Sequence, residues 1–121
     1  MQLKKYPSAI ADTLNQIADL DYAIVTLKFE AEAIETVIES TVAFAEALKN
    51  DTQRKAKKAE MLQQSDRYQE IVTKLSLNQL NKAKLTARLE QLRGEFSVMK
   101  LQRKAGIVRN LTGLDIEEIA S

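Results

Sequence analysis

Seam positions recur at alternating spacings of three and four residues along the first part of the chain. They are Ile10, Leu14, Ile17, Leu20, Ile24, Leu27, Ala31, Ile34, Ile38, Thr41, Ala45 and Leu48. A mean spacing of about 3.5 residues is typical of a coiled-coil seam, where one stripe of a helix packs against a partner. We therefore predict a first helical arm over residues 8–49, with Ser8 as its N-cap. Further apolar residues are expected to lie beside this seam and widen it: Val25, Phe29, Val37, Val42 and Phe44.

A second stretch follows the same spacing rule. Its seam positions are Tyr68, Ile71, Leu75, Asn78, Lys82, Leu85, Leu89, Leu92, Phe96 and Met99. The pattern predicts a second arm over residues 66–105, with Gly106 as its end. The polar residues Asn78 and Lys82 admit two interpretations. Either they lie in the seam and help to fix its register, or neighbouring apolar residues replace them locally and turn them outward. These neighbours are Leu77, Leu80 and Ala83.

Two polar breaks separate the arms, at residues 50–52 and 64–66. Their Asn, Asp and Ser side chains compete for backbone hydrogen bonds and so favour caps and turns. A short basic helix is expected between the breaks, over residues 52–64. The second arm would start at a capping box of Asp66 with Gln69, or with Ser65 as its cap.

The chain is predicted to be a single all-α domain over residues 1–121. It holds three glycines and one proline, so long helices meet few breakers. The expected fold is a long antiparallel helical hairpin with a short connecting helix. Residues 110–121 are expected to form a short tail with a turn and one short helical piece. A two-helix hairpin buries one stripe per helix, so we expect a homodimer, completed as a four-helix bundle.

Charge is divided unevenly between the arms. Residues 8–48 hold eight acids and one base, whereas residues 49–109 hold 15 bases and six acids. Antiparallel arms can therefore match charge across the seam. If Leu48 lies opposite Tyr68, Glu35 is expected near Lys82, Glu32 near Lys84, and Asp12 near Arg103 and Lys104.

The composition argues against catalysis. The chain has no cysteine and no histidine, so it has no thiolate ligand, no disulfide and no imidazole base. Glu32, Glu35 and Glu39 share a helix face, and we interpret them as solvated partners of the second arm. We predict no enzyme activity, no catalytic residue, no metal and no cofactor. The sequence has no apolar run long enough to span a membrane and no secretory signal at its start, so a cytoplasmic location is expected.

Five bases gather within ten residues at the turn of the hairpin: Lys49, Arg54, Lys55, Lys57 and Lys58. This basic tip cluster could contact phosphate or a partner. The alternative is that the bases serve solubility and pair with the acids of the first arm. A second group of bases is found at Lys100, Arg103, Lys104 and Arg109. The aromatic residues Tyr68, Phe96, Phe29 and Phe44 are expected to pack at the seams.

Parts of the chain resemble a known group of proteins. The relevant pieces are LKNDTQRKA at 48–56, YQE at 68–70 and ARLEQLRGEFS at 87–97. Together they resemble small helical proteins of uncharacterised function in bacteria, especially cyanobacteria, and in phage-like mobile elements. The resemblance covers residues 48–100. It implies a coiled-coil fold and, because some such genes occur in phage recombination neighbourhoods, a DNA-related accessory role. It implies no catalytic residue.

Two functions follow as hypotheses. The first is a structural or protein-interaction module that associates with itself and has an unidentified protein partner. The second is a nucleic-acid-binding accessory protein that uses the basic tip cluster. Bases neutralised by acids of the first arm would favour the first hypothesis, and a continuous uncompensated basic stripe would favour the second.

Overall fold

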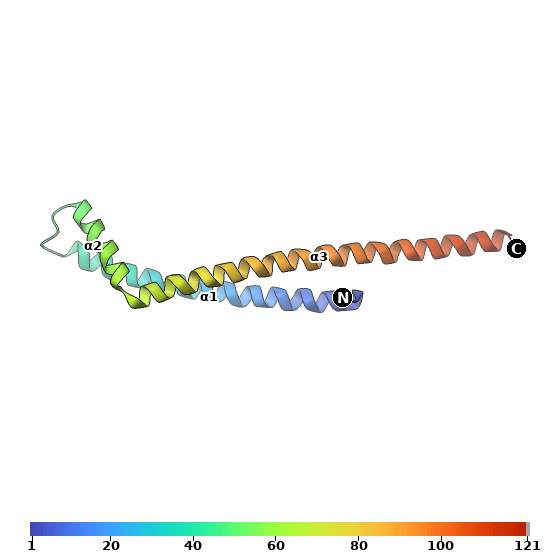
Figure 1. Cartoon of the computed structure of the whole chain (residues 1–121), viewed down its shortest axis with the longest axis horizontal. Coiled ribbons are helices and arrows are strands. Elements are labelled where there is room, and N and C mark those ends of the chain that lie inside the picture. The colour runs from blue at the N-terminus through green and yellow to red at the C-terminus, as the bar shows by residue number, and fades with distance from the viewer. Residues whose placement is uncertain (121) are drawn as a thin grey trace. The chain divides into compact units, whose positions relative to one another are not determined.

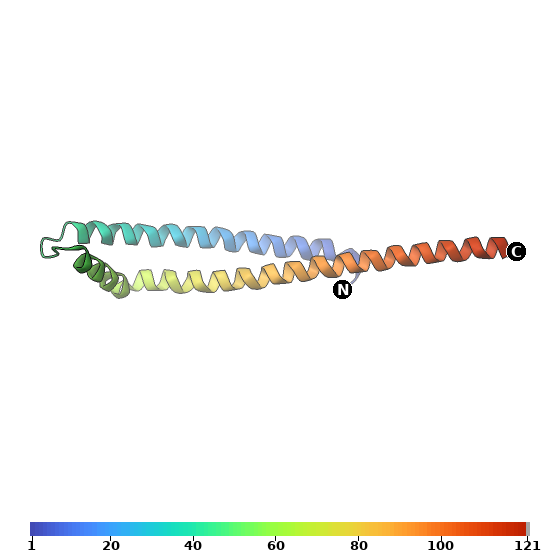
Figure 2. The same cartoon turned by 90° about the horizontal axis from the view of Figure 1, so that it is seen from above.

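The computed structural model describes the backbone of residues 1–120 and the side chains of residues 1–112. A 3-10 turn, η1 (Leu3–Lys5), precedes three helices: α1 (Tyr6–Ala43), α2 (Asp51–Gln64) and α3 (Asp66–Ala120). The described residues contain no strand. Helix α1 packs against the longer α3 in the opposite direction, which confirms the predicted all-α helical hairpin (Figures 1 and 2).

Helix α1 differs from its predicted bounds at both ends. It begins at Tyr6, so Ser8 lies inside the first turn and is not the cap; Pro7 is tolerated there because first-turn amides need no helical acceptor. The helix ends at Ala43 and not at 49. The backbone amides of Ala45 and Leu48 then bond to carbonyls three residues back, both at 3.2 Å. These tight turns reverse the chain into a loop over residues 44–50.

The connecting helix α2 has the predicted position. Asn50 is its N-cap, and the Asn50 side chain accepts a hydrogen bond from the Gln53 amide at 2.9 Å. The Gln53 side chain in turn accepts from the Lys49 amide at 2.8 Å. At the other end, the Ser65 hydroxyl accepts from the Tyr68 amide at 3.2 Å, so Ser65 is the cap that starts α3.

Helix α3 continues through the predicted stop at Gly106. It also continues through residues 110–113, where a turn was expected, and ends at Ala120. The described glycines have no positive φ, so no left-handed helix cap forms. The prediction of a separate tail was therefore wrong for residues 110–120, and Ser121 lies outside the described residues.

The chain divides into two compact units, which we describe separately. The turn unit consists of Ile17–Ala83. Here Lys82 pairs with Asp21 at 2.5 Å, Arg67 pairs with Glu30 at 2.5 Å, and the Tyr68 hydroxyl donates to Glu35 at 2.7 Å. The predicted register is thus wrong by 13 positions, because Tyr68 lies against position 35 and not 48.

Helix α2 accounts for this shift. It folds back beside the end of α1, where Lys58 pairs with Glu39. The last turns of α1 are therefore covered by α2 and not by α3. The expected proximity of Glu35 to Lys82 does not occur, since Lys82 pairs with Asp21.

The seam of the turn unit is formed mostly by the predicted residues. Its buried apolar residues are Ile24, Ala31, Ile38, Val42 and Ile71. Asn78 and Lys82 are half-buried seam residues, whereas Leu77 and Leu80 are 55% and 52% exposed. The interpretation that places the polar pair in the seam is therefore confirmed. The aliphatic stem of Lys82 can follow the seam while its ammonium reaches Asp21 at the edge.

The terminal unit consists of Met1–Gln16 with Lys84–Ser121. The Tyr6 ring stacks on Phe96 with centroids 5.5 Å apart, and its hydroxyl donates to Glu95 at 3.2 Å. Leu89 and Leu92 are buried. Thr13 takes the buried seam position expected for Leu14, and its hydroxyl donates to the Ala9 carbonyl at 2.8 Å.

The stacking of Tyr6 on Phe96 fixes the register of the terminal unit. Helix α3 continues past the start of α1, so the residues after Phe96 run beyond Tyr6 (Figures 1 and 2). Asp12 follows Tyr6 along α1 and therefore lies on the side of Tyr6 away from the residues that follow Phe96. The predicted pairing of Asp12 with Arg103 and Lys104 was therefore wrong.

Candidate functional site

The most distinctive surface of the turn unit is the side of α1 that faces away from the seam. Tyr22, Val25, Phe29 and Val37 are 76%, 51%, 67% and 65% exposed. Val25, Phe29 and Val37 were expected to widen the seam. They lie well away from it instead, because a helix turns about 100° per residue and these positions come closer to the opposite side. Of the flanking residues, Val42 is buried as predicted.

Uncharged residues follow this side of α1 over about six turns, with the exposed acids Asp19 and Glu32 at its edges. Its members are Ala18, Tyr22, Val25, Thr26, Phe29, Ala33, Thr36, Val37 and Ser40, and all are exposed. We call this set the α1 outer face. The Thr26 hydroxyl donates to the Tyr22 carbonyl at 3.0 Å, so its hydrogen-bonding capacity is partly used within the helix. The outer face is about 33 Å long at 1.5 Å per residue.

Five acids border the outer face; Asp19 and Glu32 are exposed and make no ion pair among the described residues, whereas the other three are neutralised by bases of the other helices. Asp21 pairs with Lys82 and Glu30 pairs with Arg67, both from α3. Glu39 pairs with Lys58 from α2. These contacts neutralise three of the bordering acids, and Glu32 remains at the edge of the strip near Phe29 as a carboxylate without an ion pair in the described part of the chain.

Sequence reasoning missed Tyr22 as a member of this face. The signal was present, because Tyr22 and Phe29 are seven residues apart and lie about half a turn from the seam residues Ile24 and Ala31. Phe44, in the loop after α1, is 86% exposed. The expected packing of Phe29 and Phe44 at the seam was thus wrong, whereas Tyr68 and Phe96 are half-buried there as predicted.

The basic tip cluster is brought together by α2 and the loop, but most of its bases have acidic partners. Arg54 pairs with Asp51 at 3.3 Å, Lys57 pairs with Glu60 at 3.6 Å, and Lys58 pairs with Glu39. Within the part of the chain that the structure describes, the side chains of Lys49 and Lys55 make no ion pair. Glu39 is the one partner that comes from the first arm.

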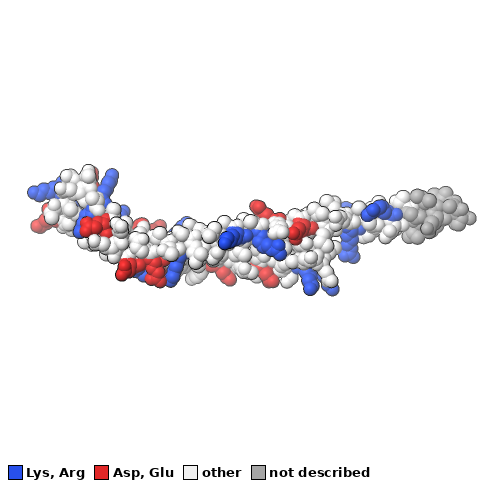
Figure 3. All heavy atoms as spheres, in the orientation of Figure 1, with Lys and Arg blue, Asp and Glu red and all other residues white. Residues whose placement is uncertain are grey.

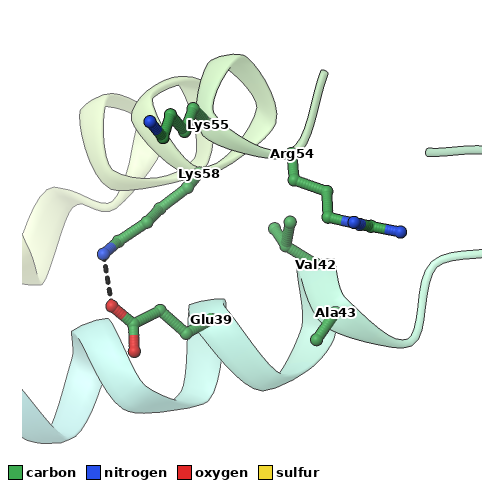
Figure 4. A pocket seen from close by; sticks show the side chains of 6 residues that line it. All are labelled: Glu39, Val42, Ala43, Arg54, Lys55 and Lys58. Carbon is green, nitrogen blue, oxygen red and sulfur yellow. Dashed lines mark hydrogen bonds and ion pairs between the residues drawn. The ribbon is translucent and has the colours of Figure 1, made fainter. Parts of the chain in front are cut away.

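A shallow hollow of about 200 Å³ lies between α2 and the end of α1 (Figure 4). Its lining residues are Glu39, Val42, Ala43, Arg54, Lys55 and Lys58. Figure 4 shows Lys58 reaching across to Glu39, whereas Arg54 extends past Val42. The Arg54 Nε is buried and has no hydrogen-bond partner. The hollow lacks a nucleophile with an adjacent base, so its residues offer charge and apolar contact only.

The titratable groups of the two units have structural roles. Hydrogen bonding to Glu35, together with burial, raises the pKa of the Tyr68 phenol. Burial and the bond to Glu95 raise the pKa of the Tyr6 phenol. Both phenols therefore stay protonated at neutral pH and remain donors. The hydrogen bond from Lys74, aided by Arg67, lowers the pKa of the exposed Glu70 carboxyl.

Metal ligation and membrane insertion find no support among the described residues. No group of three or more acidic side chains there is arranged to hold a metal ion, the Glu32, Glu35 and Glu39 series included. No described helix is both long enough and apolar enough to cross a membrane.

Comparison with known proteins finds no matching family model, no matching curated protein and no matching solved structure. The resemblance of residues 48–100 to small bacterial and phage-associated helical proteins stays a prediction. Functional inference therefore rests on the surfaces described above.

Proposed function

We propose that the chain is a non-enzymatic helical interaction module that forms a homodimer through the α1 outer face. The observation that carries this proposal is the exposure of Tyr22, Val25, Phe29 and Val37 on one side of α1. Apolar residues gathered on one exposed strip are typical of an interaction surface. The two seams are already used within the chain, so the partner binds elsewhere than at the seam.

The charges around the outer face favour the same face of a second chain as its binding partner. In a two-fold dimer the same patch meets itself, so the patch must not repel its own copy. The outer face largely meets this condition: its members are uncharged, and Asp21, Glu30 and Glu39 beside it are paired within the chain. Asp19 and Glu32 at its edges make no ion pair among the described residues, so the dimer must keep these two carboxylates in water. We therefore propose back-to-back contact of two α1 helices in place of a four-helix bundle with one shared core.

Sedimentation equilibrium tests this proposal. One strip of a single helix is a small interface, so we expect a dimer that dissociates on dilution, with a dissociation constant in the range of about 1 to 100 μM. The apparent mass should rise from the 13.6 kDa of one chain toward twice that value. A mass that stays at one chain up to about 500 μM contradicts the proposal.

We further propose a cytoplasmic location and no cofactor. The absence of histidine and cysteine from the whole sequence supports a non-enzymatic role, because the most common bases, nucleophiles and metal ligands are missing. An additional, unidentified protein partner is compatible with the exposed loop that carries Phe44.

The alternative function is nucleic-acid binding by the basic tip cluster. It is supported by Lys49 and Lys55, which make no ion pair within the described part of the chain, and by the exposed ring of Phe44. Against it stand the ion pairs of Arg54, Lys57 and Lys58. Contact of the cluster with phosphate stays a prediction, and its test is included in the experiment below.

A further inference from the structure

Positive charge is concentrated in the terminal unit. Residues 1–16 and 84–112 hold nine bases and three acids, a net charge of 9 − 3 = +6. The turn unit holds nine bases and 11 acids, a net charge of 9 − 11 = −2. Three further acids at residues 115–118 belong to the terminal unit and bring its net charge to 9 − 6 = +3. The ion pairs described above all lie in the turn unit, where Lys49 and Lys55 still make none; in the terminal unit no base makes an ion pair among the described residues.

These bases gather on α3 after Phe96. Lys100, Arg103, Lys104 and Arg109 are all exposed, and residues 97–112 contain no acid. None of the four makes an ion pair in the described part of the chain; Lys100 instead lies over the Phe96 ring, 4.3 Å from its centroid. In Figure 3 the part of α3 next to the grey residues carries Lys and Arg atoms and no acidic atoms on the face in view.

The register explains why α1 does not neutralise this patch. Tyr6 lies against Phe96, so Asp12, the acid of α1 in this unit, is on the far side of Tyr6 from the patch. The residues before Tyr6 add charge of the same sign, because Lys4 and Lys5 are exposed. Glu95, the nearest acid on α3, accepts hydrogen bonds from Tyr6 and Gln91.

We propose that Lys100, Arg103, Lys104 and Arg109 bind the sugar–phosphate backbone of a nucleic-acid duplex without reading its base sequence. The four bases span about 14 Å along the helix; Lys100, Arg103 and Lys104 lie within about 100° of one another around its axis, and Arg109 lies about half a turn from Lys100. Several phosphates of one strand fall within such a length. Exposed lysine and arginine side chains can reach phosphates on either side of the helix, and arginine can bind two oxygens at once. This site goes beyond the proposed dimer and uses none of its residues.

Two observations favour a duplex over other polyanions. Single-strand binding relies on exposed rings on which bases stack, but the aromatic residues of this unit, Tyr6 and Phe96, stack on each other. A membrane-surface helix needs a continuous apolar side. Here Lys104 interrupts the exposed stripe of Leu101, Val108 and Leu111.

Fluorescence anisotropy with a mixed-sequence DNA duplex of about 20 base pairs tests the site across a salt series. The patch variant replaces Lys100, Arg103, Lys104 and Arg109 by Gln. The tip control replaces Arg54, Lys55, Lys57 and Lys58 by Gln, the same change in charge, and so tests the competing site of the alternative function in the same experiment. We expect the patch variant to bind at least about tenfold more weakly at about 100 mM salt. Its log–log salt slope should fall by about 3 to 4 units, and the tip control should bind like the wild type.

Any of the following results would contradict the proposed binding site on α3. Absence of wild-type binding at about 20 mM salt excludes a phosphate-binding role. Loss of binding in the tip control alone assigns the contact to the tip cluster. Equal losses of affinity in the two variants would show that DNA binding depends on the net charge of the chain and not on the position of the bases. Tighter binding to a single strand of the same sequence, or to vesicles of phosphatidylserine and phosphatidylcholine, would assign the patch to a different ligand. Helix content measured by circular dichroism verifies that both variants fold, and sedimentation tests dimerisation separately.

Discussion

Replacing Ile71 by alanine is expected to lower the free energy of unfolding by about 3 kcal/mol. Ile71 is completely buried in the seam of the turn unit, with 0% of its surface exposed. The substitution removes three carbons from a packed site and leaves a cavity, a change that commonly costs about 2 to 5 kcal/mol. A chain of this size has a total stability on the order of 10 kcal/mol, so the loss is a large fraction of the whole.

Thermal unfolding followed by circular dichroism at one fixed protein concentration measures this effect. Leu77→Ala is the matched control, because Leu77 lies on the same helix and is 55% exposed. The control should change the free energy of unfolding by less than about 1 kcal/mol. Equal destabilisation by the two substitutions would show that position 71 does not lie in a packed core.

Replacing Phe29 by glutamate is expected to abolish dimerisation. Phe29 lies near the middle of the α1 outer face and is 67% exposed in the single chain, so the change costs the monomer little. In a two-fold dimer it would place two carboxylates in one apolar contact, where each loses water and repels the other. We expect the dissociation constant to rise at least about a hundredfold, equivalent to about 2.7 kcal/mol.

Gln79→Glu is the control for this change. Gln79 is exposed on α3, so the substitution adds the same charge away from the outer face. Sedimentation equilibrium should show a single-chain mass for Phe29→Glu and wild-type association for Gln79→Glu. Association of Phe29→Glu at the wild-type concentration would place the dimer contact on another surface.

Much of the fold could be predicted from the periodicity of the chain. Spacings of three and four identified the seam from Ile17 to Ile38 and all ten seam positions of α3. Local side-chain chemistry identified both breaks, because the side chains of Asn50 and Ser65 accept hydrogen bonds from backbone amides only three residues further along the chain. Signals of this kind depend on neighbours in the sequence, so they need no knowledge of the tertiary structure.

The register could not be predicted in the same way. It depends on where α1 ends, and no strong helix breaker follows Ala43. The end coincides with the place where α2 packs against α1, at the contact of Lys58 with Glu39, and such tertiary packing is not visible in the sequence pattern. Gly106 was misleading for a related reason: glycine permits a helix end but does not enforce one.

The error in register also affected which basic cluster was chosen as the candidate site. The expected pairs assigned the acids of α1 to the wrong bases, so the sequence could not show which basic cluster stays unneutralised. In the structure the tip cluster acquires acidic partners, whereas Lys100, Arg103, Lys104 and Arg109 acquire none in the described residues. The α1 outer face was not recognised in the sequence because Val25, Phe29 and Val37 were assigned to the margins of the seam and Tyr22 was not considered.

Cysteine cross-linking tests the central claim, that a second copy binds the α1 outer face, most directly. The chain has no cysteine, so one introduced thiol per chain is unambiguous. Ala33→Cys places it in the outer face and Ala59→Cys places it on exposed α2. Two helices in contact lie about 10 Å apart, within reach of a short bismaleimide. The account predicts rapid formation of covalent dimers by Ala33→Cys and slow, collision-limited formation by Ala59→Cys. Equal rates, or faster cross-linking at position 59, would contradict it.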